Sequence, residues 1–295
     1  MGLLEYVDRY LVERPGLSRD YCRLLTATAT KLCAWADRPL ALADVDRAML
    51  GRWATALLLA DRPSTVNDKL RMVRTLLLAA YDDDLLEKPP KRVRKLPEYL
   101  SPPQAWTIEE CRRLFVALAR APGTVGDVPA ADWWSSLCLT VYWTAVRIGA
   151  LLRAETQDYW PGEGLTVTRQ KNGRQQWYSL PPSCCEAVER VLPESGPIWL
   201  WPYHKNTLWH HFRGYVEAAR LPAPKAHCQL FYRLRRTNLS YCAAEDPAIA
   251  QRQADHASLE TTRRHYLDPR IARQRSAADV LPDPTPQKPR LRVIG

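Results

Sequence analysis

A proline-rich, basic stretch divides this 295-residue chain and constrains its fold more than any other feature. The segment EKPPKRVRKLPEYLSPPQAW, residues 87–106, contains five prolines and a run of lysine and arginine from Lys88 to Lys95, without helical or strand periodicity. Proline lacks the amide hydrogen of regular structure, so neither a helix nor a central strand continues through this segment. A chain of this length can bury two cores. We therefore predict two domains joined by a basic linker at residues 89–105, which is either solvated or close to an anionic partner.

Residues 1–88 have the pattern of a small helical domain. The stretches LSRDYCRLLTATATKLCAWADR, ALADVDRAMLGRWATALLLA and STVNDKLRMVRTLLLAAYDDD carry apolar residues at helical spacing. In the third stretch Ser64 is a candidate N-cap. Its apolar stripe consists of Val66, Leu70, Val73, Leu77 and Tyr81. A domain of four helices is the expected sum.

Residues 106–280 are predicted to form a second domain, mainly α-helical with a small β-hairpin or sheet. Thr107 caps the first helix, TIEECRRLFVALAR, and two glutamates follow in its first turn. The strand signal is GLTVTRQKNGRQQWYSLP, centred on Asn172-Gly173, the dipeptide best suited to a type I′ turn. The tail at residues 281–295 is rich in proline and expected to be disordered without a partner.

Composition limits the function classes. The net charge of +10 is shared: residues 1–96 hold 17 basic against 13 acidic side chains, and residues 97–295 hold 25 against 19. Two basic domains indicate a long anionic partner, most simply nucleic acid. There is no secretory pattern and no apolar run of about 20 residues, so we expect a cytoplasmic protein without a membrane span. The eight cysteines form no C-x-x-C pair and no carboxylate cluster suits Mg²⁺, so we expect free thiols, no metal and no cofactor.

Three cations stand out by their position. Arg147 is the only charge in SSLCLTVYWTAVRIGALL, residues 135–152, where one helix is predicted, and it needs either a structural salt bridge or a bound anion. In HCQLFYRLRRTNLSYCAA, residues 227–244, Arg235 borders the predicted buried side on the same face as Tyr232, whereas Arg236 is expected to be a solvated surface charge. Lys171 precedes the Asn-Gly turn, where a lysine is usually only solvated but can also carry a proton donor into a site.

The segment ADHASLETTRRHYLDP, residues 254–269, combines His256 and Tyr266. A helix is predicted from Leu259 to Tyr266, capped by Ser258 and stopped at Asp268-Pro269. Ten residues of straight helix would separate His256 from Tyr266 by about 15 Å. A turn before the cap would let the two side chains converge.

Together these residues suit attack on a DNA phosphodiester. Ionising a tyrosine near neutral pH costs about 4 kcal/mol, and the phenolate must approach a group that is already negative. Two arginines neutralise the phosphate, and a cationic acid protonates the leaving oxygen. The chain offers Arg147, Arg235, Lys171, His256 and Tyr266 for this chemistry, without a metal.

These motifs resemble those of the tyrosine recombinase (phage integrase) family over nearly the whole chain. TAVRIGALL resembles the first arginine motif, TRQKNGRQQWYSLP the hairpin with the catalytic lysine, and DHASLETTRRHYLDP the closing histidine and nucleophile segment. YRLRRT stands where the family has a His-x-x-Arg box, so Tyr232 replaces the histidine. Ala145 and Ala150 replace the usual glycine before, and acidic residue after, the first arginine. The spacing from His256 to Tyr266 is one residue longer than the commonest version, which would place His265 at the nucleophile position.

The resemblance implies a helical core-binding domain, a linker and an α+β catalytic domain of a site-specific recombinase that integrates or excises a mobile element. Tyr266 would form a 3′-phosphotyrosyl link and free a 5′-hydroxyl. Arg147 and Arg235 would clamp the phosphate, Lys171 would act as the acid, and His256 and Tyr232 would position groups around it. The implied partners are double-stranded DNA, a homotetramer on two recombination sites and candidate accessory DNA-bending proteins, with nucleoid association when DNA is bound.

Candidate phosphate contacts lie on the third helix of residues 1–88 and in the linker. They are Lys69, Arg71, Arg74, Lys91, Arg92, Arg94 and Lys95. Three other readings stay open: a degenerate homologue that binds DNA without cutting it, a type IB topoisomerase that relaxes supercoils as a monomer, and a structural helical protein with Arg147 in a buried ion pair.

Overall fold

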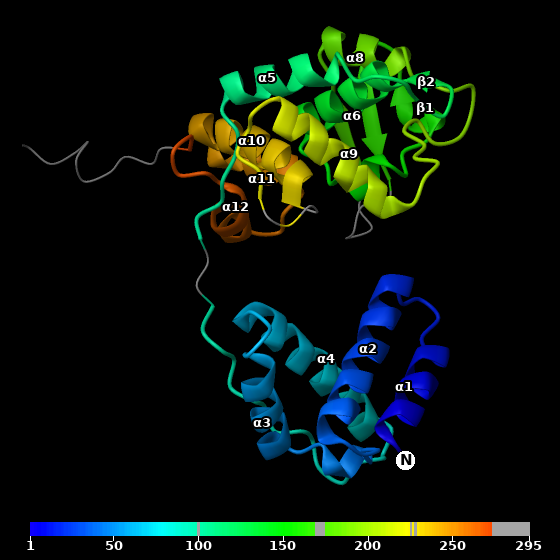
Figure 1. The fold of residues 1–295 in the computed structure, drawn as a ribbon, viewed down its shortest axis with the longest axis vertical. Coiled ribbons are helices and arrows are strands. Elements are labelled where there is room, and N and C mark those ends of the chain that lie inside the picture. Colours follow the sequence, from blue (N-terminus) through cyan, green and yellow to red (C-terminus); the bar gives the residue numbers. More distant parts are fainter. Residues whose placement is uncertain (99–100, 169–174, 225, 227–228, 273–295) are drawn as a thin grey trace, which may run out of the picture. The chain divides into compact units, whose positions relative to one another are not determined.

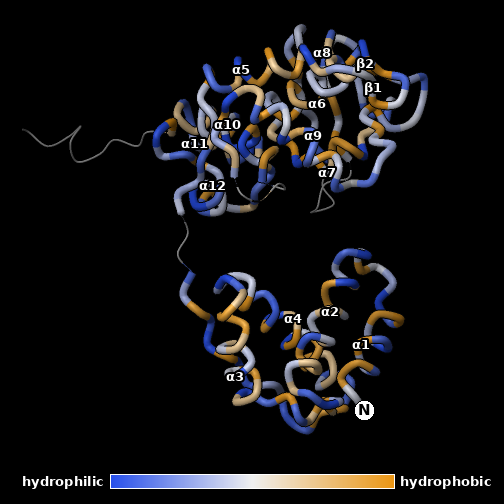
Figure 2. The backbone as a smooth tube through the Cα atoms, in the orientation of Figure 1, coloured by the Kyte–Doolittle hydropathy of each residue, from blue (hydrophilic) through white to orange (hydrophobic). Residues whose placement is uncertain are grey.

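Helices make up the N-terminal unit, Met1–Leu100, of the computed structural model (Figure 1). The structure describes residues 1–98, 101–168, 175–224, 226 and 229–272. Within residues 1–98 the elements are α1 (Leu3–Val12), α2 (Arg19–Ala36), the 3-10 turn η1 (Leu42–Asp44), α3 (Arg47–Leu57) and α4 (Pro63–Asp82). The apolar positions that recur along these helices are visible as alternating orange and blue in Figure 2. They enclose Trp53 of α3, which is 0% exposed.

The predicted stripe of α4 is buried except at its end. Val66, Leu70, Val73 and Leu77 lie in the core, whereas Tyr81 is 37% exposed, so its inclusion was wrong. The predicted N-cap was also wrong. The helix begins at Pro63, with Arg62 at the cap position, because proline has no amide hydrogen to leave unbonded in the first turn.

The basic segment that follows α4 is attached to this unit over part of its length. The side-chain amide of Asn67 donates to the carbonyl of Leu96 (3.0 Å) and accepts from its N–H (2.9 Å). It also donates to the Glu98 carboxylate at 2.7 Å. Val93 and Leu96 pack against the core. Residues 93–98 are therefore held along α4.

The second unit, Ser101–Gly295, surrounds a central helix with further helices and two small sheets. In the part that the structure describes, its elements are α5 (Ile108–Leu118), β1 (Thr124–Val125), β2 (Val128–Pro129), α6 (Ala130–Thr144), α7 (Ile148–Leu151), η2 (Thr156–Asp158), β3 (Tyr159–Trp160), β4 (Gly164–Val167), β5 (Gln176–Ser179), α8 (Pro182–Glu189), α9 (Lys205–Ala218), α10 (Leu230–Glu245), α11 (Pro247–Ala254) and α12 (Leu259–Tyr266). The predicted mainly α-helical class with a small sheet is confirmed.

The larger sheet has the strand order β3-β4-β5, with both pairs antiparallel. The predicted strands pair with Thr166 opposite Trp177, and β3 is an additional strand that the sequence did not indicate. Leu165, Val167 and Tyr178 face the core, whereas Trp177 is exposed on the other face. The predicted turn at Asn172-Gly173 and the tail at 281–295 lie outside the described residues.

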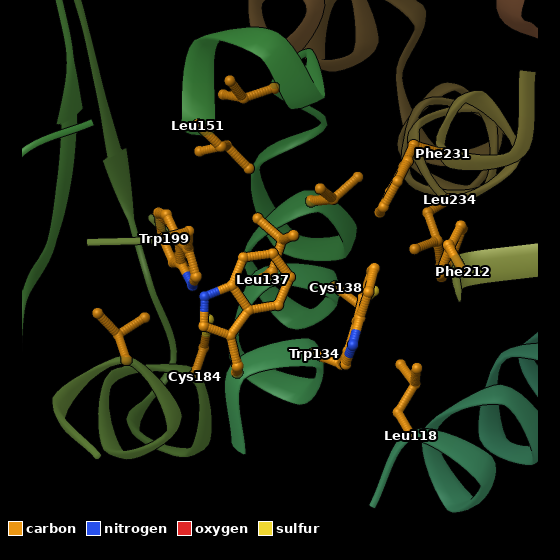
Figure 3. Packing of buried hydrophobic residues seen from close by; sticks show 14 of the residues in the cluster. Leu118, Trp134, Leu137, Cys138, Leu151, Cys184, Trp199, Phe212, Phe231 and Leu234 are labelled. Atoms are coloured by element: carbon orange, nitrogen blue, oxygen red, sulfur yellow. The ribbon is translucent and has the colours of Figure 1, made fainter. Parts of the chain in front are cut away.

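Helix α6 forms the centre of the second core (Figure 3). Trp134 stacks on Phe212 of α9, with ring centroids 5.9 Å apart, and Phe212 stacks on Phe231 of α10 at 4.0 Å. On another side the Trp199 indole N–H donates to Ser136 Oγ at 3.0 Å. Truncating a buried tryptophan of this kind to alanine costs about 3–5 kcal/mol. This packing fixes α10, which carries Tyr232 and Arg235, against α6.

Candidate active site

Arg147 lies at a break between two helices. One continuous helix over residues 135–152 was predicted, but α6 ends at Thr144, Ala145 takes the left-handed conformation (φ 53°), and α7 begins at Ile148. The last carbonyls of α6 have no acceptor role within the helix, and side chains of other helices donate hydrogen bonds to them. These bonds stabilise the interruption. Asn238 donates to the Tyr142 carbonyl at 2.8 Å and Gln253 to the Trp143 carbonyl at 2.8 Å.

The break leaves Arg147 half-buried, in extended conformation before α7. Among the described residues, no carboxylate lies within 4.0 Å of its guanidinium. The salt bridge that was one of two explanations for this arginine is therefore not found in that part of the chain.

Arg235 is enclosed by three segments. It is 2% exposed and donates hydrogen bonds to the carbonyls of Ala145 and Ala254, the latter at 3.0 Å. Its Nε atom is buried without a hydrogen-bond partner in the structure, and no described carboxylate pairs with it. Burial lowers the pKa of Arg235, and the nearby charge of Arg147 acts in the same direction. An arginine remains protonated even when burial and a nearby charge lower its pKa. The site therefore holds two cations without a counter-charge from the described residues.

The Tyr266 ring lies against this cation. The guanidinium carbon of Arg235 is 5.0 Å from the centroid of the Tyr266 ring. The rings of His256 and Tyr232 are 4.7 Å and 6.3 Å from it, centroid to centroid. His265 is exposed, and its carbonyl accepts a hydrogen bond from Arg236 Nε at 3.3 Å. The geometry thus places Tyr266, rather than His265, among the predicted catalytic residues.

His256 reaches Tyr266 because it precedes the N-cap of α12. Helix α11 ends at Ala254, the next residue Asp255 is left-handed (φ 51°), and Ser258 caps α12. His256 Nε2 lies 3.4 Å from an Arg235 nitrogen, and its Nδ1 lies 2.9 Å from Thr262 Oγ1. Since Arg235 only donates, we assign the proton to Nδ1. Burial, then the charges of Arg235 and Arg147, lower the pKa of His256 to about 4, so its ring is neutral at neutral pH.

Two predictions for α10 need correction. Arg236 was expected to be a solvated surface charge, but it is half-buried and bonds to α12 through the His265 carbonyl. Helical spacing from Leu230, Leu234 and Thr237 also predicts Tyr241 on the buried side, but Tyr241 is 37% exposed. Tyr232 lies one turn before Arg235 and faces the Tyr266 ring, as its spacing predicts. Lys171 lies outside the described residues.

Several residues at the site carried no recognised signal in the sequence. Thr262, which bonds His256, and Arg233, which donates to Gln104 at 2.7 Å, are both buried. Asp268 looked like a helix stop, yet its buried carboxylate accepts a hydrogen bond from the N–H of Ala105 at 2.8 Å. The partners of Arg233 and Asp268 lie 129 and 163 residues away in the sequence, and local periodicity does not reveal such pairs.

The N-terminal unit contains a cavity of about 500 Å³ lined by basic side chains. They come from α4 and from the attached linker: Arg71, Arg74, Lys91, Arg92 and Lys95. Arg74 Nε is buried and has no hydrogen-bond partner among the described residues. Two lining acids are engaged with cations, since Asp68 lies 3.3 Å from Arg71 and Glu98 lies 3.1 Å from Lys95.

The other two candidate phosphate contacts lie elsewhere. The ammonium group of Lys69 is bound to Asp61. Arg94 is exposed and does not line the cavity. Asn67, which holds the linker, was not predicted to have a role.

Within the described residues, no group of three His, Cys, Asp or Glu side chains could hold a metal ion. No helix in the same part of the chain combines the length and apolarity needed to cross a membrane. The cysteines that the structure describes are free thiols.

Comparison with known proteins identifies the fold. No known family model and no curated protein sequence match this chain. Among solved structures, a lambda integrase dimer bound to a COC′ core site is 15% identical, with 88% of this chain and 97% of that chain covered and a TM-score of 0.67. The Tn1549 transposon integrase in complex with transposon right end DNA is 13% identical, with 95% and 97% covered and a TM-score of 0.69.

A lambda integrase tetramer bound to a Holliday junction is 16% identical, with 89% of this chain and 77% of that chain covered and a TM-score of 0.63. The shared architecture is a mainly helical chain with small antiparallel sheets. It is the fold of the tyrosine recombinases, and this chain has it.

Proposed function

We propose that this protein is a site-specific DNA recombinase that cuts and rejoins DNA through a 3′-phosphotyrosyl intermediate, in the integration or excision of a mobile element. One observation carries the proposal: two neighbouring arginines, Arg147 and Arg235, have no carboxylate partner among the described residues, and Arg235 packs on the Tyr266 ring. The purely structural reading required Arg147 in a buried ion pair, which is not found in that part of the chain.

Unpaired arginines in a folded interior favour an anionic ligand. Enclosing a guanidinium without a counter-charge is costly, and an anion that binds there relieves that cost. A phosphate fits best because its non-bridging oxygens accept the two parallel hydrogen bonds that an arginine offers. The Tyr266 ring beside Arg235 then places a nucleophile next to that anion.

The proposed reaction is the one that the resemblance to tyrosine recombinases implies, and these positions are compatible with it. Tyr266 Oη attacks phosphorus and loses its phenol proton to solvent, the bond from phosphorus to the 5′ oxygen breaks, and a 3′-phosphotyrosyl ester forms. Arg147 and Arg235 bind the non-bridging oxygens and stabilise the charge that grows on them in the transition state. The departing 5′ oxygen takes a proton, for which we propose Lys171 as the donor. Attack by a 5′-hydroxyl of the partner strand reverses these steps and releases the phenol.

His256 and Tyr232 are proposed to position groups around the phosphate. Because the His256 ring is neutral near pH 7, its role there is hydrogen bonding rather than charge. Its Nδ1–H is directed to Thr262 of α12, and its Nε2 faces Arg235. His256 thus ties the nucleophile's helix to the phosphate-binding arginine.

The N-terminal unit, which corresponds to the predicted core-binding domain of residues 1–88 with its linker, is proposed to grip the DNA backbone. The basic cavity between α4 and the linker suits phosphate contacts rather than base recognition. Lambda integrase has been seen as a dimer and as a tetramer on DNA. We propose a homotetramer on two sites for this chain, with accessory DNA-bending proteins as candidate partners and the nucleoid as its location when DNA is bound.

A nicked substrate tests the proposal. Duplex DNA carrying the element's own ends, nicked beside the cleavage site, lets the short fragment with the new 5′-hydroxyl diffuse away and traps the covalent complex. Without metal, wild type and His265→Ala are expected to give a shifted band on a denaturing gel, and Tyr266→Phe none. A band that persists in Tyr266→Phe, or that disappears in His265→Ala, would place the nucleophile elsewhere.

A second candidate function follows from Tyr232. A phenol accepts a proton less readily than imidazole near pH 7, so a chain with tyrosine at this position suits a homologue that binds DNA without cutting it. Specific binding to these ends without any covalent complex would favour it. Recovery of cleavage in Tyr232→His would then identify the substitution responsible.

A further inference from the structure

Helix α12, which ends in Tyr266, is too short to fix its own position. It has eight residues, and isolated helices below about 12 residues are marginal in water. Of its side chains only that of Thr262 is buried. The placement of the Tyr266 phenol must therefore come from contacts on either side of the helix.

The contact after Tyr266 is made through Ser240 and Asp268. Ser240 Oγ of α10 donates to the carbonyl of Tyr266 at 3.5 Å and accepts from the N–H of Asp268 at 2.8 Å. The chain is thus held on α10 at the nucleophile and two residues beyond it.

The Asp268 carboxylate extends this contact to a distant segment. It is 1% exposed and accepts from the N–H of Ala105 at 2.8 Å. Arg270 donates to it through its backbone N–H (2.9 Å), its Nε (3.1 Å) and a terminal nitrogen (2.7 Å). Burial alone would raise the pKa of Asp268, but these hydrogen bonds outweigh it and the pKa is lowered. The group is charged at neutral pH and bonded on both oxygens.

Ala105 is itself fixed to α10. The next residue, Trp106, donates its backbone N–H to Thr237 Oγ1 at 3.0 Å, and its carbonyl accepts from the same hydroxyl at 2.9 Å. Arg233, also on α10, donates a hydrogen bond to the side chain of Gln104, the residue before Ala105. Asp268 therefore bonds to residues 104–106, which are attached to α10, the helix that carries Arg235.

We propose that Asp268 is a positioning residue for Tyr266: its carboxylate joins the chain after the nucleophile to Ala105 and so fixes the phenol against Arg235 and His256. This inference rests on the proposed function, in which Tyr266 attacks a phosphate at that point. A displacement of the nucleophile by about 1 Å lowers a rate by about a hundredfold. Loss of the carboxylate should therefore slow the covalent step while leaving DNA binding in place.

The test compares Asp268→Ala, Asp268→Asn and wild type in the full chain. The rate constant for the covalent complex is measured at saturating nicked duplex, beside the Kd for the same duplex. We expect a rate constant about a hundredfold lower in Asp268→Ala with an unchanged Kd, and partial rescue in Asp268→Asn, whose amide oxygen still accepts from Ala105. Asp246→Ala is the matched control, because Asp246 caps α11 through Ala248 at 2.8 Å and its hydrogen bonds within the described residues do not reach α12.

Hydrogen exchange supplies a readout that does not require activity. Amides of residues 259–267 should exchange faster in Asp268→Ala, whereas those of α10 should not change. An unchanged rate constant, or a loss matched by Asp246→Ala, would overturn the positioning role. If wild type forms no covalent complex, the proposed function fails instead, and the exchange of residues 259–267 still decides whether Asp268 holds the helix.

Discussion

Three basic side chains of the N-terminal unit and the two arginines beside Tyr266 are held in opposite ways. In the N-terminal unit Arg71, Lys95 and Lys69 each lie beside a carboxylate, and the first two are exposed. In the second unit Arg147 and Arg235 have none among the described residues, and Arg235 is buried. Exposed pairs contribute little to stability and exchange partners easily. Enclosing an arginine without a counter-charge is costly, and a bound anion would lower that cost. On the proposed function, the difference separates a surface that grips DNA from a site that acts on one phosphate.

The largest expected effect is at Arg235. Arg235→Lys keeps the charge but loses the planar fork that bonds Ala145 and Ala254, so it cannot hold a phosphate in the same way. We expect covalent-complex formation to fall by about 10²–10³-fold, measured by single-turnover kinetics on nicked duplex. Arg112→Lys, at an exposed arginine of α5 that pairs with Glu109, is the control. Equal effects of the two changes would remove the distinction between enclosed and exposed arginines.

The next effect concerns the exposed linker cations. Removing both charges in the double variant Lys91→Ala, Arg92→Ala should weaken DNA binding by about tenfold and lower the slope of log K against log salt by about 2. The rate constant at saturating DNA should not change. Titrations by fluorescence anisotropy at several salt concentrations measure both quantities. Arg9 and Arg38, which pair with Glu13 and Asp44, give a matched double variant whose slope should stay at the wild-type value.

Asn67 tests whether the linker must be held in place. Asn67→Ala removes no charge but releases Leu96 and Glu98, so the linker cations lose their fixed position. We expect DNA affinity to fall by about threefold, because a few linker residues regain conformational entropy in the free protein. The slope of log K against log salt should not change. Thr55→Ala is the control, since Thr55 Oγ1 bonds only within its own helix, to Gly51 at 3.2 Å. An unaltered affinity in Asn67→Ala would mean that the attachment serves folding alone.

His256 adds a pH dependence to the second unit. Its pKa is about 4 in the folded chain and about 6.5 when unfolded. Between these values the unfolded chain binds more protons, so stability should fall as the pH drops from 6.5 toward 4. Urea unfolding at pH 7 and pH 5 measures this loss, which should be smaller in His256→Gln. The same substitution at the exposed His265 is the control, and an equal change there would argue against a buried His256.

The smallest effect is expected at Ala145. Its φ of 53° is unfavourable for a residue with a Cβ atom, by about 1 kcal/mol relative to glycine. Ala145→Gly should therefore raise the free energy of unfolding of this unit by about 1 kcal/mol in urea titrations. Ala150→Gly, placed within α7, should lower it by a similar amount. A lower stability in Ala145→Gly would indicate that the left-handed turn is not under strain.

The sequence predicted what depends on local pattern. Helical spacing predicted the buried stripe from Val66 to Leu77 and the shared face of Tyr232 and Arg235. Residue type predicted the caps Thr107 and Ser258. The break at Ala145 could not be predicted, because side chains 90 or more residues away bond the carbonyls that end α6. Asp268 was missed for the same reason, since Ala105 is 163 residues distant. Resemblance located the candidate nucleophile, whereas the contacts that hold it became visible only in three dimensions.

The enclosure of Arg235 also bears on the order of folding. The two carbonyls it bonds lie 90 and 19 residues away, at the end of α6 and the end of α11. The guanidinium is surrounded only when α6, α10 and α11 have all docked. A partly folded molecule would leave this charge in water. On the proposed function, strand cleavage would therefore require a chain in which these three helices have docked.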